Sequence, residues 1–167
     1  MAFLRVSRLV KNQRRKMGRN RPKIGITFGA FDFVHAGHVL HLQECKEHCD
    51  YLIVGLQTDP SIDRPHKNKP VMSLEERIIM LRANKYVDAI LVYENEKEVY
   101  FLDQWLPDVR FMGKDHWEKC LKKKHHPINA KVIYTSRKHN YSSSALRDRI
   151  KNARDLIRSF LYGAVHG

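Results

Sequence analysis

The sequence has no apolar run long enough to cross a membrane and too few cysteines for a disulfide framework. A helix that spans a bilayer needs about 20 consecutive apolar residues, and no stretch of this 167-residue chain approaches that length. The three cysteines, Cys45, Cys49 and Cys120, are odd in number and irregularly spaced. These absences argue against a membrane-spanning protein and against a small disulfide-stabilised secreted domain, and they predict a reduced, cytoplasmic location.

Acidic residues are missing from the first 23 positions, which carry nine of the thirteen excess positive charges of the chain. The nine cations of this segment are Arg5, Arg8, Lys11, Arg14, Arg15, Lys16, Arg19, Arg21 and Lys23. A segment of this kind predicts a flexible basic extension over residues 1–22. Organelle targeting and contact with nucleic-acid phosphates are alternatives that the pattern leaves open.

Apolar runs rich in β-branched residues recur along the rest of the chain and alternate with segments of helical spacing. The predicted strands are Ile24–Phe28, Tyr51–Leu56, Ala89–Tyr93, Val109–Met112 and Lys131–Tyr134. This alternation predicts a single α/β domain over residues 23–152, doubly wound around a mainly parallel five-stranded sheet. Residues 153–167 are predicted to form a helical tail. In such folds ligands bind beyond the carboxyl ends of the strands.

Four helices are predicted between or after these strands. The clearest begins at Ser73, which forms a capping box with Glu76 and precedes apolar residues on one helical face. The others are predicted over residues 37–48, 96–105 and 143–152. Residues 58–72, called the cationic loop, contain Pro60, Pro65 and Pro70 together with Arg64, His66, Lys67 and Lys69. This loop follows a strand end and is predicted to fold over a ligand.

The stretch GAFDFVHAGH, from Gly29 to His38, places two histidines one turn apart where the first strand meets the following helix. The free N–H groups and the positive dipole end of a helix N-terminus attract anions, and phosphate fits such a place. A side chain at Gly37 would crowd any group brought close to the backbone. A turn whose histidines merely face solvent is the competing interpretation of His35 and His38 alone.

Several further segments, in order, make the chain resemble the cytidylyltransferase-like nucleotidyltransferase family. They are GAFDFVHAGH, RPHKNKPVMSLEER, YVDAI, DVRFMGKDHW and SRKHNYSSSALRDRI. The similarity covers about residues 23–150 and is greatest to glycerol-3-phosphate cytidylyltransferases. It is nearly as great to the adenylyltransferase that makes ADP-heptose. The resemblance implies a Rossmann-like enzyme that joins CTP to glycerol 3-phosphate or a similar acceptor and releases pyrophosphate. An ATP-dependent enzyme that forms an ADP-sugar or a dinucleotide cofactor is the alternative.

The resemblance also implies roles for individual residues. The catalytic residues would be His35, His38, Lys67 and Arg137, with Lys69 as an alternative to Lys67. The nucleotide would contact Gly29, Ala30, Phe31, Gly37, Asp115, Ser142, Ser143 and Ser144. The acceptor would contact Asp32, Arg64 and Arg77. Mg²⁺ would arrive with the nucleotide, and no metal site of the protein's own is implied. A homodimer is expected because small members of the family commonly form one.

The last motif departs from the family pattern R-T-E-G-I-S-T-[ST]. Here the matching residues run from Arg137 to Ser144 as RKHNYSSS, which keeps the arginine and the hydroxyls but loses the acidic residue and the glycine. Since the lost part lies near the base in the family, the choice between CTP and ATP stays open. A nucleic-acid-binding scaffold without catalysis is an alternative from another class.

Two smaller features have structural explanations as well as functional ones. Asp32 and Asp115 could orient the acceptor or hold Mg²⁺ through water, or they could cap adjacent backbone. His41, Cys45 and Cys49 recur every four residues and could ligate zinc. A fourth ligand with suitable spacing is missing, so these cysteines are interpreted as buried hydrophobic residues. Trp117 is interpreted as a core residue.

Overall fold

A computed structural model describes residues 21–95, 97–99, 107–114, 130–136 and 138–166, and in the last helix it describes side chains through Ile157. Strands and helices alternate along most of this part of the chain. In chain order they are β1 (Ile24–Gly29), α2 (Ala36–Glu47), β2 (Tyr51–Gln57), α3 (Pro60–Asp63), α4 (Leu74–Arg82), β3 (Ala89–Tyr93), β4 (Val109–Gly113), β5 (Lys131–Thr135) and α7 (Ser143–His166).

The five strands form one sheet in the order β3-β2-β1-β4-β5, and every strand pair is parallel. The predicted α/β fold with a five-stranded parallel sheet is therefore confirmed. The strand order reverses between β1 and β4, because β1 leads to β2 and β3 on one side while β4 and β5 lie on the other. A reversal of this kind opens a crevice at the carboxyl ends of the two central strands.

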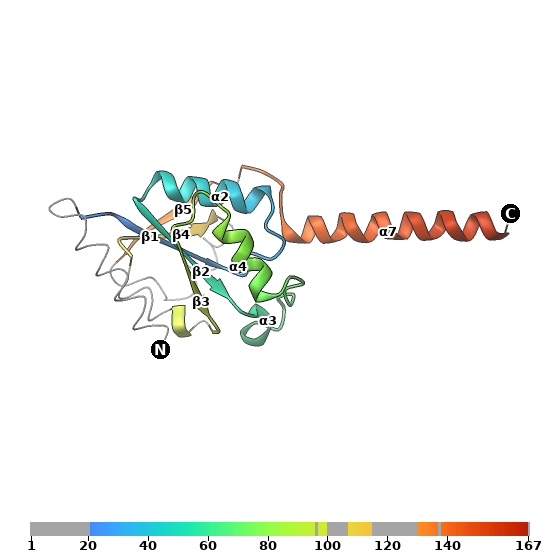
Figure 1. Ribbon diagram of the computed structural model, residues 1–167, viewed down its shortest axis with the longest axis horizontal. Coiled ribbons are helices and arrows are strands. Elements are labelled where there is room, and N and C mark those ends of the chain that lie inside the picture. Colours follow the sequence, from blue (N-terminus) through green and yellow to red (C-terminus); the bar gives the residue numbers. More distant parts are fainter. Residues whose placement is uncertain (1–20, 96, 100–106, 115–129, 137, 167) are drawn as a thin grey trace.

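The core fills both faces of the sheet, as alternation along buried strands requires. On one face, Leu42 and Cys45 of α2 and Leu81 of α4 join Leu52 and Val54 of β2 in one buried cluster. On the other face, Ile24 and Ile26 of β1 pack with Ile53 and Leu91. Figure 1 shows α2 and α4 lying against the sheet. Burial of Cys45 and Cys49 confirms their interpretation as core residues.

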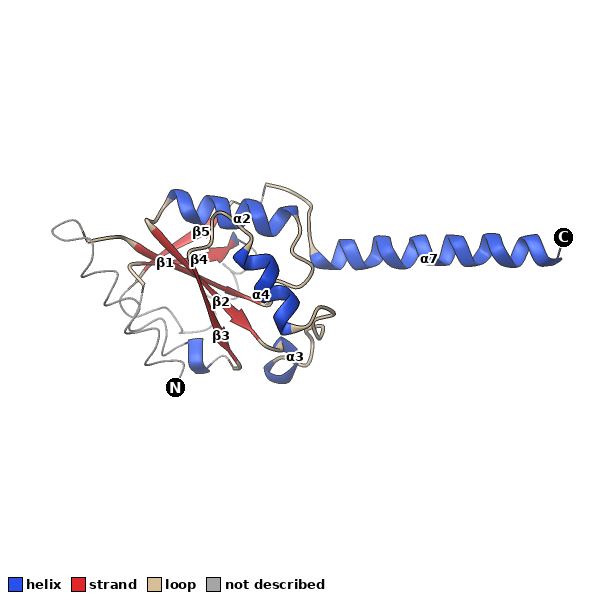
Figure 2. Ribbon diagram, in the orientation of Figure 1, coloured by secondary structure: helices blue, strands red, loops and turns tan. Residues whose placement is uncertain are grey.

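Two helices differ from the sequence predictions. The cationic loop contains the short helix α3, which Asp59 caps by accepting from the Ser61 N–H at 2.9 Å and which has Pro60 in its first turn. The helix predicted over residues 143–152 and the predicted helical tail over residues 153–167 form one continuous helix, α7, which ends at His166 and projects away from the sheet (Figures 1 and 2). Most of the helix predicted over residues 96–105 lies outside the described residues. No described helix is apolar and long enough to span a bilayer.

Candidate active site

His35 and His38 lie at the start of α2, directly after the carboxyl end of β1. His35 is the N-cap of α2, and its Nδ1 accepts a hydrogen bond from the Gly37 N–H at 3.1 Å. The two imidazole rings are stacked, with centroids 3.9 Å apart. The first turn of α2 holds no acidic side chain. The positive end of this helix and two imidazoles therefore face the same end of the crevice, which is suited to an anion.

A serine at the start of α7 fixes the ring of His35. Ser143 Oγ lies 3.3 Å from His35 Nε2 and donates to the Asp32 main-chain oxygen at 3.0 Å. Since His35 Nδ1 accepts from Gly37, the neutral tautomer that satisfies both contacts carries its hydrogen on Nε2. Ser143, predicted to contact the nucleotide, thus also joins the beginning of α7 to residues 30–38, which we call the histidine turn.

Gly37 is required by a contact within the protein. A Cβ atom at this position would lie 2.8 Å from His139 Cε1 and 2.9 Å from the Tyr141 main-chain oxygen. Because a main-chain atom cannot move aside without shifting its loop, any side chain here would displace residues 138–142. The sequence pattern predicts the close approach of a ligand at this glycine; in the structure the loop before α7 already lies there.

Asp32 is buried, with 6% of its surface exposed, and its carboxylate binds three donors of the protein. It accepts from the main-chain N–H groups of Val71 at 3.2 Å and Met72 at 3.0 Å, and it pairs with Arg147 of α7. Burial opposes its ionisation, but these hydrogen bonds and the arginine outweigh burial and hold the pKa of Asp32 below its usual 3.8. Contact of Asp32 with the acceptor stays a prediction.

The depressed pKa of Asp32 predicts a pH-dependent contribution to stability. The contribution is present above the unfolded-state pKa and is lost as the pH falls through the lower folded-state pKa. Asp32→Asn should lower the free energy of unfolding by about 2 kcal/mol at pH 7, with a smaller difference near pH 3. Urea denaturation of both proteins at the two pH values measures this, with Asp148→Asn on exposed α7 as the control. An equal difference at both pH values would contradict it.

Arg77 of α4 is 2% exposed and donates four hydrogen bonds to main-chain oxygens. Its Nη1 donates to the main-chain oxygens of Ala30 at 2.9 Å and Gln57 at 2.7 Å, Nη2 donates to that of Thr58 at 2.7 Å, and Nε donates to that of Ser73 at 3.3 Å. Burial lowers the pKa of Arg77, against the opposing effect of nearby carboxylates. The guanidinium joins the ends of β1 and β2 to the start of α4. Its predicted contact with the acceptor stays a prediction.

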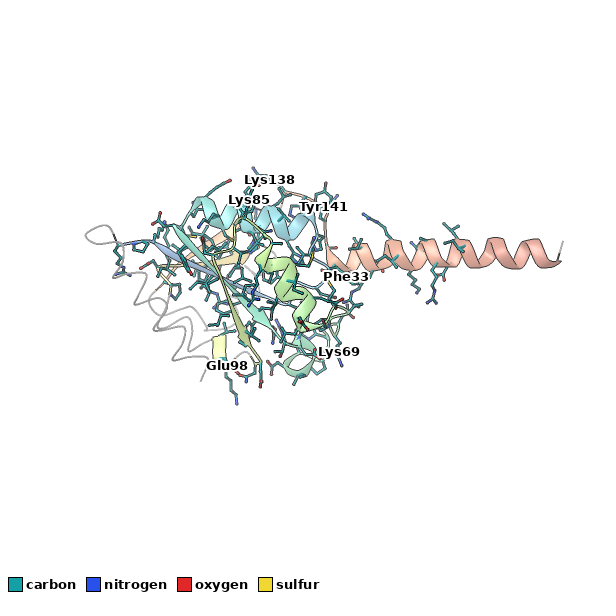
Figure 3. The ribbon with its side chains drawn as sticks, viewed as in Figure 1. Phe33, Lys69, Lys85, Glu98, Lys138 and Tyr141 are labelled. Atoms are coloured by element: carbon teal, nitrogen blue, oxygen red, sulfur yellow. The ribbon has the colours of Figure 1, made fainter. Side chains whose placement is uncertain are left out.

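The cationic loop presents its lysines to solvent. Lys67 and Lys69 are exposed, whereas Arg64 is half-buried and donates to the Gln57 side-chain oxygen at 2.6 Å. Figure 3 labels Lys69 on this loop near α3, and Tyr141 and Phe33 close to the beginning of α7. The structure leaves the choice between Lys67 and Lys69 open.

The remaining predicted residues fall into three groups. Gly29 and Ala30 are half-buried at the end of β1, and Phe31 is buried with its ring 5.1 Å from that of His38. Ser142 Oγ accepts from the Ala145 N–H at 3.1 Å, which caps α7, and Ser144 is exposed. Arg137, Asp115 and Trp117 lie outside the described residues.

A hollow of about 240 Å³ opens beside His35, between the start of α2, residues 140–142 and the first turns of α7. Arg149 lines this hollow, and Arg147 lies on the same helix. Neither arginine is predicted from the sequence motifs, although both follow Ser142, Ser143 and Ser144 within one or two helical turns. The serine hydroxyls at the start of this helix are suited to binding an anion. Cations one or two turns further along the same helix could therefore have been identified as candidate site residues.

His41, which the sequence groups with Cys45 and Cys49 as possible zinc ligands, contacts threonines of two strands. Its Nε2 is 2.8 Å from Thr27 Oγ1 of β1, and its Nδ1 is 2.8 Å from Thr135 Oγ1 of β5. Both ring nitrogens are therefore engaged with hydroxyls of β1 and β5, the two strands on either side of β4. This geometry makes His41 a structural link beneath the site.

The two buried cysteines should be unreactive in the folded protein. Burial raises the pKa of Cys49 to about 11 and raises that of Cys45 further. In a Cys120→Ser variant, which removes the remaining thiol, Ellman's reagent at pH 8 should modify less than about 0.1 equivalent before unfolding and both thiols after it. One rapidly modified thiol in the folded variant would contradict this expectation.

Comparison with known proteins places most of the chain in one family. Residues 26–149 match the model described as cytidylyltransferase-like. The bifunctional protein HldE of Helicobacter pylori (strain Shi470) is 32% identical over 137 residues, which is 79% of this chain and 28% of that protein. HldE of Campylobacter jejuni (strain 81116) is 32% identical over 134 residues, 80% of this chain and 29% of that protein. The chain therefore spans less than a third of these curated relatives.

A solved structure has the same fold. The lipopolysaccharide core biosynthesis protein from Thermoplasma volcanium superposes with a TM-score of 0.56 at 24% identity, and the match covers 72% of this chain and 99% of that one. The match supports the arrangement of strands and helices described above.

Proposed function

This chain belongs to the cytidylyltransferase-like nucleotidyltransferase family, and we propose that it joins a nucleoside triphosphate to a small phosphorylated acceptor. An oxygen of the acceptor phosphate attacks the α-phosphorus, the bond from the α-phosphorus to the bridging oxygen breaks, and pyrophosphate leaves. The product is a nucleoside diphosphate linked to the acceptor. CTP with glycerol 3-phosphate or a similar polyol phosphate is our first choice of substrates.

The stacked pair of His35 and His38 at the positive end of α2 carries this proposal. Charge builds up on phosphate oxygens during attack at phosphorus, and fixed N–H donors in a crevice stabilise that charge. Neutral imidazoles suffice as donors, so the mechanism needs no covalent enzyme intermediate. Arg149 adds positive charge beside His35, and the last residues of the cationic loop bind Asp32 in the same turn. In this proposal the protein contributes by positioning the two substrates and by stabilising the negative charge on the phosphate.

Mg²⁺ is proposed to arrive with the triphosphate. The carboxylate of Asp32 is occupied by protein donors, and that of Asp59 accepts from Ser61 at 2.9 and 2.6 Å. In this proposal the ligands of the ion are therefore phosphate oxygens and water, an arrangement that suits the preference of Mg²⁺ for few protein ligands.

ATP is the second candidate nucleotide because of the loop before α7. This loop has His139 and Asn140 where the family pattern has an acidic residue and a glycine, and Tyr141 follows them. His139 packs on Gly37 and its ring lies 5.4 Å from that of Tyr141, so the substituted residues are part of the site wall. The resemblance to the adenylyltransferase that makes ADP-heptose also favours ATP. The product would then be an ADP-sugar or a dinucleotide.

The test is pyrophosphate release by the full chain with Mg²⁺, each nucleoside triphosphate and a panel of phosphorylated acceptors. We expect release with CTP or ATP that requires one acceptor, and a rise in melting temperature with that same nucleotide, because a ligand that binds only the folded form stabilises it. Absence of release with every pair, together with salt-sensitive binding of an oligonucleotide, would favour the scaffold hypothesis instead.

A further inference from the structure

We infer that Arg147 of α7 is a positioning residue, which holds the cationic loop against the histidine turn through Asp32. The inference rests on the proposed function, because that loop carries Lys67 and Lys69, one of which the family resemblance implies is catalytic. Arg147 is not among the residues predicted from the sequence. Its assignment comes from contacts that join three segments far apart in the chain.

The guanidinium of Arg147 contacts two of these segments at once. It pairs with the Asp32 carboxylate, and its Nη2 donates to the Lys69 main-chain oxygen at 3.3 Å. Its central carbon lies 5.6 Å from the centroid of the Phe33 ring, which covers one side of the planar group. The side chain is 26% exposed, so water screens it only in part. Arg147 therefore links α7 to both the turn after β1 and the cationic loop.

The backbone around Asp32 turns its carboxylate inward. Phe31 and Phe33, on either side, have φ angles of 48° and 49°, in the left-handed region that non-glycine residues rarely adopt. The inward carboxylate accepts from the N–H groups of Val71 and Met72, the last two residues of the cationic loop. Asp32 thus holds the end of the loop by its amides, and Arg147 holds it by the carbonyl of Lys69.

The consequence for the site is that Lys67 and Lys69 are held within a few residues of a fixed anchor. Both lysines are exposed and their chain segment has little packing of its own, so the anchor at residues 69–72 limits where they can reach. The first turn of α7 also carries Ser143, which contacts His35. Hence the start of α7 positions both His35 and the lysine-bearing loop, and catalysis that works by positioning depends on such contacts.

Arg147→Gln is the variant that tests the inference, with Arg154→Gln as its matched control. The control removes the same charge from the same helix at an exposed position. Hydrogen exchange of the peptide that contains Val71 and Met72 is the readout independent of activity. We expect exchange about fivefold or more faster in Arg147→Gln and unchanged in Arg154→Gln. Exchange at the wild-type rate in Arg147→Gln would overturn the inference.

Kinetics then separate positioning from direct contact. Arg147→Gln should raise KM for the nucleotide about tenfold, and Arg147→Lys should recover part of the loss because an ammonium can still pair with Asp32. If Arg147 acts through the loop lysines, its effect should shrink to less than about twofold in either the Lys67→Ala or the Lys69→Ala background. Full multiplicative effects in both backgrounds would overturn the inference in favour of a direct contact with substrate.

The two hypotheses fail in distinguishable ways. Absence of pyrophosphate release by the wild-type chain would contradict the proposed function, while the exchange measurement would still decide whether Arg147 anchors the loop. If Arg147→Gln does not fold, Arg147→Met provides the same comparison of exchange, because methionine cannot pair with Asp32. Faster exchange in that variant supports the anchor, and wild-type exchange contradicts it.

Discussion

Replacing His38 with alanine should lower kcat for pyrophosphate release by about 10²- to 10³-fold while changing KM for the nucleotide much less. The reason is that an imidazole donor aimed at the reacting phosphate gains strength as charge builds up in the transition state. His38 lies inside α2 rather than at its N-cap, so its removal should leave the fold intact. Steady-state kinetics at saturating acceptor measure the effect.

His35 needs a different substitution because its side chain also caps α2. His35→Ala would remove the acceptor for the Gly37 N–H and cost about 1 kcal/mol of stability in addition to activity. His35→Asn keeps a cap acceptor and removes the imidazole, so a comparable fall in kcat with an unchanged melting temperature is expected. His48→Ala, at the other end of α2, is the control. Activity within about threefold of wild type in both His35→Asn and His38→Ala would contradict the catalytic role of this histidine pair, on which the proposed function depends.

The elements and the sheet could be predicted from the sequence because their signals are local. Apolar runs such as Tyr51–Leu56 and the capping box of Ser73 and Glu76 each act within a few residues, and the structure has β2 over Tyr51–Gln57 and α4 over Leu74–Arg82. The histidines at the strand-to-helix turn could be predicted for the same reason: a helix start is a local feature that attracts anions.

The contacts that hold the site together could not be predicted in the same way. Asp32 and Arg147 are 115 residues apart, and nothing in the spacing of either residue indicates the other. The sequence predicts a close approach at Gly37, but the group that approaches is the loop at His139 and Tyr141, which only the fold brings there. Arginine is mostly exposed in proteins, so the full burial of Arg77 also has no local signal.

These long-range contacts share one physical origin. Parallel strands end together at one edge of the sheet. The last carbonyls of the strands and the amides of the turns that follow are buried there, and they need hydrogen-bond partners from outside the sheet. Arg77 donates to carbonyls at the ends of β1 and β2, and Asp32 accepts from amides that precede α4. The edge of the sheet that forms the anion site therefore also needs buried charged side chains, which pair with its main-chain carbonyls and amides.

Replacing Arg77 with methionine should destabilise the fold more than Asp32→Asn or His35→Ala does. Methionine fills a similar volume without charge, but the oxygens of Ala30, Gln57, Thr58 and Ser73 lose their donor. Each buried carbonyl left without a partner costs about 1–3 kcal/mol, and partial access of water reduces the sum, so a loss of about 3–5 kcal/mol is expected. For a chain of this size that loss corresponds to a fall of about 10 °C in Tm.

Urea denaturation and thermal melting of Arg77→Met measure this loss, and Arg82→Met at the exposed end of the same helix is the control. Arg77→Lys should recover only a minor part, because a compact ammonium cannot reach oxygens on four different residues as a planar guanidinium does. A loss below about 1 kcal/mol in Arg77→Met would show that the main chain does not depend on this residue. If that stable variant had a raised KM for the acceptor alone, Arg77 would have to be assigned to the acceptor, because a purely structural arginine would change both substrates or neither.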